Sequence, residues 1–263
     1  MEERGRLDRG DGVELAWIRQ PGRSPTIVFL PGFQSEMQGE KGTHLARFAA
    51  DRGHALLRCD YSGHGKSGGS FTAGSIGRWT EDALAVIDRK ADGKLLLVGS
   101  SMGGWIALLA ALARPDRIAG LIGIAAAPDF TENLMWRAMT PVEQEKLLAM
   151  GSLTVEGPYD PPLVITRTLI EDGRRHLLLG GPIGLTCPVR LLHGSRDHDV
   201  PWETALRIAE HLTSTDVRVT LVKDGEHRLS RPDDLALLSS TLGDLLEPSL
   251  PSPRGRGAGN EGG

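Results

Sequence analysis

Cysteine is scarce in this sequence, with two in 263 residues, Cys59 and Cys187. Two cysteines are too few for a disulfide framework, and they lie at opposite ends of their apolar runs, so we expect two free thiols in a reducing compartment. The sequence also lacks a large excess of either charge: it has 30 basic and 34 acidic residues, for a net charge of −4. This balance offers no broad attraction to phosphate backbones or anionic lipid, so nucleic acid is not expected as a partner.

Long apolar runs are also missing. The longest nearly unbroken one, residues 118–127, contains two glycines and falls far short of the roughly 18 to 20 residues that span a bilayer, so no membrane span is expected. The first dozen residues, MEERGRLDRGDG, have no apolar signal core, and their acidic side chains argue against an organelle transit peptide. We therefore expect a cytoplasmic protein.

Short aliphatic or β-branched runs alternate with longer helical patterns, which is typical of parallel strands joined by crossover helices. The expected strands are residues 13–19, 26–30, 55–59, 95–99, 118–125, 189–193 and 217–222. The expected helices are residues 43–52, 76–91, 102–113, 202–212 and 232–246. Most strand runs are apolar throughout, as in strands buried on both faces. The sequence thus predicts the α/β class, with a mostly parallel central sheet flanked by helices.

Residues 128–186 break this alternation with short helical segments and Pro/Gly joints. Because long insertions in compact domains tend to be functional, we expect a helical lid there, inserted into a core of residues 12–127 and 187–247. A helical excursion without function is the alternative. Residues 248–263 are mainly small, proline or charged, and we expect this tail to be disordered.

The pattern G-x-S-x-G, which lifts a serine hydroxyl clear of a sheet on a tight strand-to-helix turn, occurs twice. Gly65–Gly69 has Ser67 at its centre and lies in a glycine-rich loop with no helix after it. Gly99–Gly103 has Ser101 at its centre, between the apolar run KLLLVG and the helical pattern GGWIALLAALA. This context favours Ser101 as the nucleophile, and the flanking glycines are expected to remove clashes at the turn.

A serine hydroxyl needs a base to take its proton, and in this kind of site an acid and then a histidine follow the serine along the chain. His227 stands directly after the last expected strand and before the last helix, which favours it as the base. The other histidines after Ser101 lie in the expected lid, at a strand end, beside an acidic loop and inside a helix: His176, His193, His198 and His211.

Two aspartates compete for the role of the acid in the segment HGSRDHDVP, which leaves a strand and enters a helix. The spacing G-x-x-D-x-x-V-P favours Asp197. Asp199 is the alternative, and is more consistent with bonds to loop amides or solvent. An ionised Asp197 would hold the proton-bearing nitrogen of His227 and fix its tautomer.

The negative oxygen of a tetrahedral intermediate must meet preset hydrogen-bond donors, and two backbone N–H groups suffice. Met102 is expected to supply one, because it follows Ser101 at the start of a helix. The loop LPGFQSEMQG after the second expected strand is expected to supply the other, at Phe33.

No metal or cofactor is expected. The spacings H-E-x-x-H and paired cysteines, which hold metals, do not occur. The glycines of the loop DYSGHGKSGG have a spacing seen in nucleotide sites, but no strong helix opens on this loop and no P-loop motif is complete. A tight structural loop is the better interpretation.

Together these motifs resemble the α/β-hydrolases, over essentially residues 12–247. Within that family, three segments are similar to mitochondrial α/β-hydrolase-domain enzymes described as palmitoyl-protein thioesterases and acyl glucuronide esterases. These segments are LPGFQSEMQGEK, VGSSMGGWIALLAALARPDRIAGLIGIAAAP and CPVRLLHGSRDHDVPWETALRIAEHLTSTDVRVTLVKDGEHR. The resemblance implies Ser101, Asp197 and His227 as a catalytic triad, with Phe33 and Met102 as oxyanion donors. The start of the chain points instead to a bacterial, cytosolic relative.

We therefore expect a serine hydrolase that cleaves carboxylic esters or thioesters through an acyl-serine intermediate, as a thioesterase, a depalmitoylase or an acyl glucuronide esterase. Two alternatives stay open: a carbon-carbon bond hydrolase of a dicarbonyl compound, and a catalytically silent ligand-binding protein of the same fold. The substrate is expected to be a small or acylated molecule. Met135, Trp136 and Met139 are candidates for the walls of an acyl pocket, although residues at this spacing also simply pack a lid onto a core.

Overall fold

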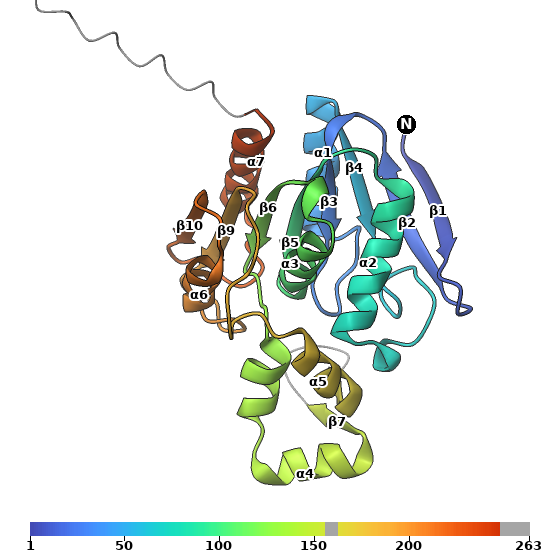
Figure 1. Cartoon of the computed structure of the whole chain (residues 1–263), viewed down its shortest axis with the longest axis vertical. Helices are drawn as coiled ribbons and strands as arrows, with labels where there is room; N and C mark the ends of the chain where they lie inside the picture. Colours follow the sequence, from blue (N-terminus) through green and yellow to red (C-terminus); the bar gives the residue numbers. More distant parts are fainter. Residues whose placement is uncertain (156–162, 248–263) are drawn as a thin grey trace, which may run out of the picture.

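The central sheet of the molecule is mostly parallel. A computed structural model describes residues 1–155 and 163–247, so the predicted disordered tail lies outside the described residues. Within these ranges, eight strands form one sheet in the order β1-β2-β4-β3-β5-β6-β9-β10, and β7 and β8 form a separate small sheet (Figure 1). The strands from β4 to β10 in this order pair in parallel, whereas β1 and β2 pair antiparallel at one edge. The predicted α/β fold class is confirmed.

The element bounds follow the predicted alternation closely. The strands of the central sheet are Glu3–Asp8 (β1), Glu14–Gln20 (β2), Arg23–Leu30 (β3), His54–Cys59 (β4), Leu95–Ser100 (β5), Ile118–Ile124 (β6), Val189–Gly194 (β9) and Val217–Val222 (β10). The helices around it are Glu40–Arg52 (α1), Ile76–Lys90 (α2), Met102–Ala113 (α3), Glu203–His211 (α6) and Pro232–Leu246 (α7). Helices α3 and α7 have the bounds that the sequence predicts.

The two faces of the sheet are covered by different helices, which explains why its strands are apolar throughout. On β5, Leu95 and Leu97 lie in a buried cluster with side chains of α2, α3 and α6. Leu96 and Val98 point the other way, into a cluster with α1 and α7. Successive side chains of a strand alternate between faces, so a sheet between two helical layers needs apolar residues at every position.

Residues 128–186 form an insertion between β6 and β9. Its longer elements are Pro141–Met150 (α4), Ser152–Val155 (β7), Leu163–Thr166 (β8) and Arg167–Gly173 (α5). In Figure 1 the insertion projects beyond the sheet and carries α4 at its far end. The short antiparallel pair of β7 and β8 is not predicted by the sequence. The lid role of the insertion stays a prediction, and residues 156–162 within it lie outside the described residues.

A single carboxylate ties the start of this insertion to its end. Asp129 accepts hydrogen bonds from the backbone N–H groups of Leu178 and Leu179, at 2.8 and 2.9 Å. Its side chain is buried, and burial raises the pKa of the Asp129 carboxyl above its usual value. The two ends of the insertion are therefore held side by side.

The sheet begins before residue 12, where the sequence placed the start of the core. Strand β1 pairs along its whole length with β2, from Glu3 with Arg19 to Asp8 with Glu14. The run ERGRLD is too polar for the pattern of a doubly buried strand, which fits its position at an exposed edge. Cys59 and Cys187 are both free, as expected. Within the described residues, none of the helices is long and apolar enough to cross a bilayer.

Candidate active site

Ser101 lies on a strained turn between β5 and α3. Its backbone has a φ of 53° and a ψ of −119°, in a region that non-glycine residues rarely adopt. A Cβ on Gly99 would lie 2.2 Å from the carbonyl oxygen of Gly103, and one on Gly103 would lie 2.0 Å from that of Leu30. The expected reason for these glycines is confirmed, because the strand and the helix close up with no space for a methyl group.

The structure brings together the three side chains that the sequence favours. His227 Nε2 lies 3.0 Å from Ser101 Oγ, and His227 Nδ1 lies 2.8 Å from Asp197 Oδ2. Asp197 follows β9 and His227 follows β10, so both loops leave the same edge of the sheet as Ser101. The alternative acid, Asp199, is exposed, and its backbone N–H donates to Asp197 Oδ1 at 2.9 Å.

The loops of Asp197 and His227 are held against each other by their backbones. The N–H of Arg196 donates to the carbonyl of Gly225 at 2.9 Å. A Cβ on Gly194 would lie 2.2 Å from the same carbonyl oxygen. The backbone at the end of β9 is therefore in direct contact with the backbone of the loop after β10. An aspartate and a histidine that are 30 residues apart in sequence thereby meet in a fixed relative position.

The carboxylate of Asp197 is held in its ionised form. Burial alone would raise its pKa, since the side chain is 0% exposed. Hydrogen bonds from His193, His227 and the backbone N–H of Val200 outweigh burial and hold the pKa of the Asp197 carboxyl well below its usual range. A carboxylate only accepts hydrogen bonds, so Nδ1 of His227 carries the proton and Nε2 faces Ser101 with its lone pair.

The loop that follows β3 passes next to the turn of Ser101. A Cβ on Gly32 would lie 3.4 Å from the Cβ of Ser101. Tyr61 donates its hydroxyl proton to the carbonyl of Pro31 at 3.1 Å, which fixes the start of the loop. The ring of Phe33 packs edge-on in an aromatic cluster formed with Phe71, Trp79 and Phe130. Met102 follows Ser101 directly in the chain, and Phe33 follows Gly32, which lies next to the turn of Ser101. The role of Phe33 and Met102 as oxyanion donors stays a prediction.

Ser67, the centre of the other G-x-S-x-G match, is part of the backbone framework. Its hydroxyl accepts from the N–H of Ala16 at 2.8 Å and donates to the carbonyl of Asp60 at 2.7 Å. The carboxylate of Asp60 in turn accepts from the N–H groups of Lys66 and Met37. The glycine-rich loop is therefore tied to β2 and to the loop after β3, in agreement with its structural interpretation.

The residues predicted to line an acyl pocket belong to the insertion. Met135, Trp136 and Met139 pack, partly buried, against a small apolar cluster of the insertion's own residues. The guanidinium of Arg174 lies 4.5 Å from the centre of the Trp136 ring. These contacts account for packing within the insertion, and a role in acyl binding stays a prediction.

A cavity of about 230 Å³ lies between the insertion and α6. Its walls come from the chain after β6, the first turns and the end of the insertion, the loop before α6 and α6 itself. They are Ala127, Pro128, Asn133, Leu134, Arg137, Leu179, Val200, Pro201, Glu203, Thr204 and Arg207. Two of these residues adjoin the site: Ala127 donates its N–H to the carbonyl of Ser101, and Val200 donates to Asp197. Sequence reasoning missed this cavity because its walls come from segments far apart in the chain.

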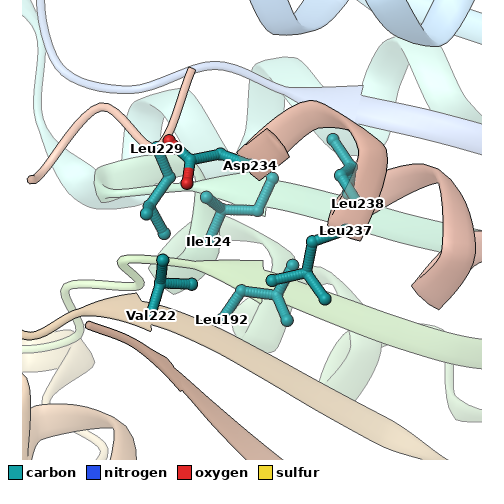
Figure 2. A pocket seen from close by; sticks show the side chains of 7 residues that line it. All are labelled: Ile124, Leu192, Val222, Leu229, Asp234, Leu237 and Leu238. Carbon is teal, nitrogen blue, oxygen red and sulfur yellow. The ribbon is translucent and has the colours of Figure 1, made fainter. Parts of the chain in front are cut away.

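A second void, of about 10 Å³, lies between α7 and the ends of β6, β9 and β10 (Figure 2). It is lined by Ile124, Leu192, Val222, Leu229, Asp234, Leu237 and Leu238. The carboxylate of Asp234 already binds the guanidinium of Arg231 at 2.8 Å. A space of this size holds one water at most, so it is a packing void of the core.

Among the described residues, Asp197, Asp199 and His227 have side-chain atoms of metal-ligand type within 4.8 Å of one another. The facing atoms of Asp197 and His227 are already joined by a hydrogen bond. We therefore assign no metal to them, and the absence of a metal cofactor stays a prediction.

A parallel sheet between helical layers, with a serine on a strained turn after β5 and a histidine and an aspartate after later strands, defines an α/β-hydrolase. The chain belongs to the Hydrolase_4 family, described as serine aminopeptidase S33, whose model matches residues 23–168. It is a hydrolase, as predicted.

The comparisons also bear out the resemblance to mitochondrial enzymes. The chain is 41% identical over 244 residues to "Palmitoyl-protein thioesterase ABHD10, mitochondrial" from Mus musculus, covering 92% of this chain and 82% of that protein. It is 40% identical to the Homo sapiens protein of the same name, covering 92% and 79%. The structure of mouse α/β hydrolase domain-containing protein 10 superposes with a TM-score of 0.87 at 39% identity, covering 93% and 98%. A putative hydrolase from Agrobacterium vitis S4 gives a TM-score of 0.88 at 39% identity, covering 94% and 99%.

The expectation of a cytoplasmic protein is wrong. It rested on the composition of the first dozen residues. Five similar proteins, 40% to 41% identical over 92% of this chain, are all named as mitochondrial. Residues Glu3–Asp8 instead form β1, an edge strand of the folded sheet. Their composition therefore reflects the fold and does not indicate a cellular compartment.

Proposed function

We propose that this protein is a serine hydrolase that cleaves carboxylic thioesters or esters through an acyl intermediate on Ser101. The observation that carries the proposal is the chain of hydrogen bonds from Ser101 Oγ to His227 Nε2, and from His227 Nδ1 to Asp197 Oδ2, at 3.0 and 2.8 Å. These distances are short enough for direct proton transfer from the hydroxyl to the ring.

The reaction has two halves in this proposal. Ser101 Oγ attacks the carbonyl carbon while His227 Nε2 takes the hydroxyl proton, and the imidazolium then gives that proton to the leaving thiol or alcohol. A water enters, and its oxygen attacks the acyl-serine while His227 takes one of its protons. His227 then returns that proton to Ser101 Oγ as the carbon–oxygen bond breaks, which releases the carboxylic acid and restores the serine. Asp197 stays ionised throughout and stabilises the imidazolium.

The N–H groups of Phe33 and Met102 stabilise the negative oxygen in both halves. Met102 is the first residue of α3, so the partial positive charge of a helix N-terminus also acts on this oxygen. The aromatic contacts of Phe33 support a fixed position for its N–H. Fixed donors stabilise a developing charge without reorganising during the reaction.

The relatives and the insertion support an acyl substrate. Curated relatives are named palmitoyl-protein thioesterases, which supports an acyl thioester as substrate. We place the acyl chain under residues 128–186, as a lid, beside Met135, Trp136 and Met139. The apolar side chains of these residues suit a hydrocarbon chain better than a polar group.

Hydrolysis of acyl thioesters and nitrophenyl esters of increasing chain length tests this function. We expect wild-type protein to turn over both kinds of substrate, with kcat/KM rising or holding from short to long acyl chains, and Ser101→Ala to be inactive on all of them. A steep fall of kcat/KM beyond short acyl chains would contradict only the assignment of a long-chain acyl substrate, and not the serine mechanism. Turnover by Ser101→Ala at the wild-type rate would contradict the serine mechanism.

A further inference from the structure

A second histidine contacts the carboxylate of Asp197. His193 lies near the end of β9 and is fully buried. Its Nε2 is 3.1 Å from Asp197 Oδ2 and 3.0 Å from the carbonyl oxygen of Val200. Both neighbours accept hydrogen bonds, so Nε2 carries a proton in the tautomer that these contacts assign. The single Nε2–H of His193 is therefore shared: it donates to the carbonyl of Val200 and lies 3.1 Å from the carboxylate oxygen that accepts from His227.

Four N–H groups surround the Asp197 carboxylate. Oδ1 accepts from the backbone N–H groups of Asp199 and Val200, at 2.9 and 2.8 Å. Oδ2 accepts from His227 at 2.8 Å and lies 3.1 Å from His193. An ionised carboxylate accepts about four hydrogen bonds, so Asp197 is saturated. Its side chain is 0% exposed, and solvent therefore has no access to replace a lost donor.

The other ring nitrogen of His193 shows which side of the ring the fold uses. Nδ1 is buried and has no hydrogen-bond partner among the described residues. A buried nitrogen without a partner is unfavourable, and an added proton there would have no acceptor. These contacts accordingly assign the proton of the ring to Nε2, which acts as the donor.

We propose that His193 is a positioning residue for the triad: its Nε2–H fixes Oδ2 of Asp197 in the direction of His227 and takes up part of the negative charge on that oxygen. This inference rests on the proposed catalytic roles of Ser101, Asp197 and His227. Sharing Oδ2 between two donors leaves Asp197 able to orient the His227 ring but less able to stabilise its charged form.

Few other charged groups face this arrangement. Asp199 is on the same loop as Asp197, and its carboxylate approaches His227. Glu226 and Arg228 flank His227 in the following loop and are exposed. Arg196 and Asp224 pair with each other at 2.9 Å between the two loops. Among the described residues, His193 and His227 are the basic side chains that contact the Asp197 carboxylate.

The test compares His193→Met with His193→Gln on an acyl ester that wild-type protein hydrolyses. Methionine fills a similar space without a donor, while the glutamine amide nitrogen reaches the Nε2 position and meets the same two acceptors. We expect His193→Met to lower kcat roughly tenfold with little change in KM. His193→Gln should restore most of the lost kcat. An unchanged kcat in His193→Met, or a glutamine variant as impaired as methionine, would overturn the proposal.

A measurement on the wild-type protein keeps the inference testable if His193→Met does not fold. Nitrogen-15 shifts of the histidine rings should show that His193 carries a proton on Nε2 and none on Nδ1. A His193 ring that carries its proton on Nδ1 would overturn the inference. Failure of the proposed serine hydrolase function would give a different result: the wild-type protein would then hydrolyse no ester, whichever nitrogen of His193 carries the proton.

Discussion

The side-chain amine of Lys41, in the first turn of α1, donates to the backbone carbonyl of Arg228, the residue directly after His227. It also donates to the hydroxyl of Ser230 at 3.2 Å. Burial lowers the pKa of the Lys41 ammonium to about 8. Lys41 of α1 thereby holds the loop that carries the proposed base, His227, which is more than 180 residues away in the sequence.

Lys41→Met should lower kcat several-fold, because the loop of His227 loses both hydrogen bonds and the ring is held less firmly toward Ser101. The free energy of unfolding should change little, since removal of a buried charge offsets the lost hydrogen bonds. Steady-state kinetics and urea denaturation measure the two effects. Lys94→Met is the matched control: Lys94 also donates to a backbone carbonyl, of Asp116, but before β5 and away from the site, so its kcat should equal wild type.

Asp197→Asn should reduce kcat by roughly a thousandfold or more, because an amide does not hold the proton of His227 on Nδ1 or stabilise the imidazolium. Asp199→Asn is the comparison that separates the two aspartates of the same loop. Its carboxylate is exposed and its backbone N–H, which donates to Asp197, is retained, so kcat should stay within a few-fold of wild type. The reverse order of effects would assign the acid to Asp199.

Acid should destabilise the protein partly through Asp197. The pKa of this carboxyl is lower in the folded protein than its ordinary 3.8 in an unfolded chain. The unfolded chain therefore binds more protons as the pH falls, so stability from this group is present above about pH 4 and is lost progressively below it. Urea midpoints measured against pH should fall less steeply below pH 4 in Asp197→Asn than in wild type. Parallel curves would show that Asp197 is not held ionised by the fold.

Gly103→Ala should prevent folding or reduce the free energy of unfolding by more than about 3 kcal/mol, because the new Cβ meets backbone atoms that have no room to move. Its position would be 2.0 Å from the carbonyl oxygen of Leu30. Gly243→Ala provides the contrast: Gly243 lies inside α7 with nothing within 4 Å of the added Cβ. That variant should be more stable by about 0.5 to 1 kcal/mol, as alanine is preferred to glycine in a helix. Thermal denaturation and soluble yield of both variants check this prediction.

The sequence was sufficient for the features that depend on local pattern. Apolar runs such as Leu95–Ser100 and the turn chemistry around Ser101 predict strands, helices and their order, because the same residues that pack the core carry the signal. The position of His227 after the last strand of the sheet follows from that order. Strand β1 was not predicted, because an edge strand need not be apolar and the polar run ERGRLD has no strand pattern.

Contacts between distant loops were not predictable in this way. The sequence alone identifies His193 only as a histidine at a strand end, although its spacing of four residues from Asp197 is visible in HGSRD. Whether the two side chains meet depends on how the loop after β9 folds back, which single-residue preferences do not encode. The same holds for Lys41 and Arg228, which are 187 residues apart. The cavity beside α6 likewise exists only once the insertion is docked against α6.

The most direct test of the central claim is covalent labelling with a fluorophosphonate probe, followed by mass spectrometry of the labelled peptide. Activated serines react with this reagent, whereas ordinary surface serines do not. We predict that native wild-type protein is labelled at Ser101, that Ser101→Ala is not labelled, and that denatured wild-type protein loses the reaction. Absence of label on native protein, or equal label on Ser101→Ala, would contradict the assignment of Ser101 as the nucleophile.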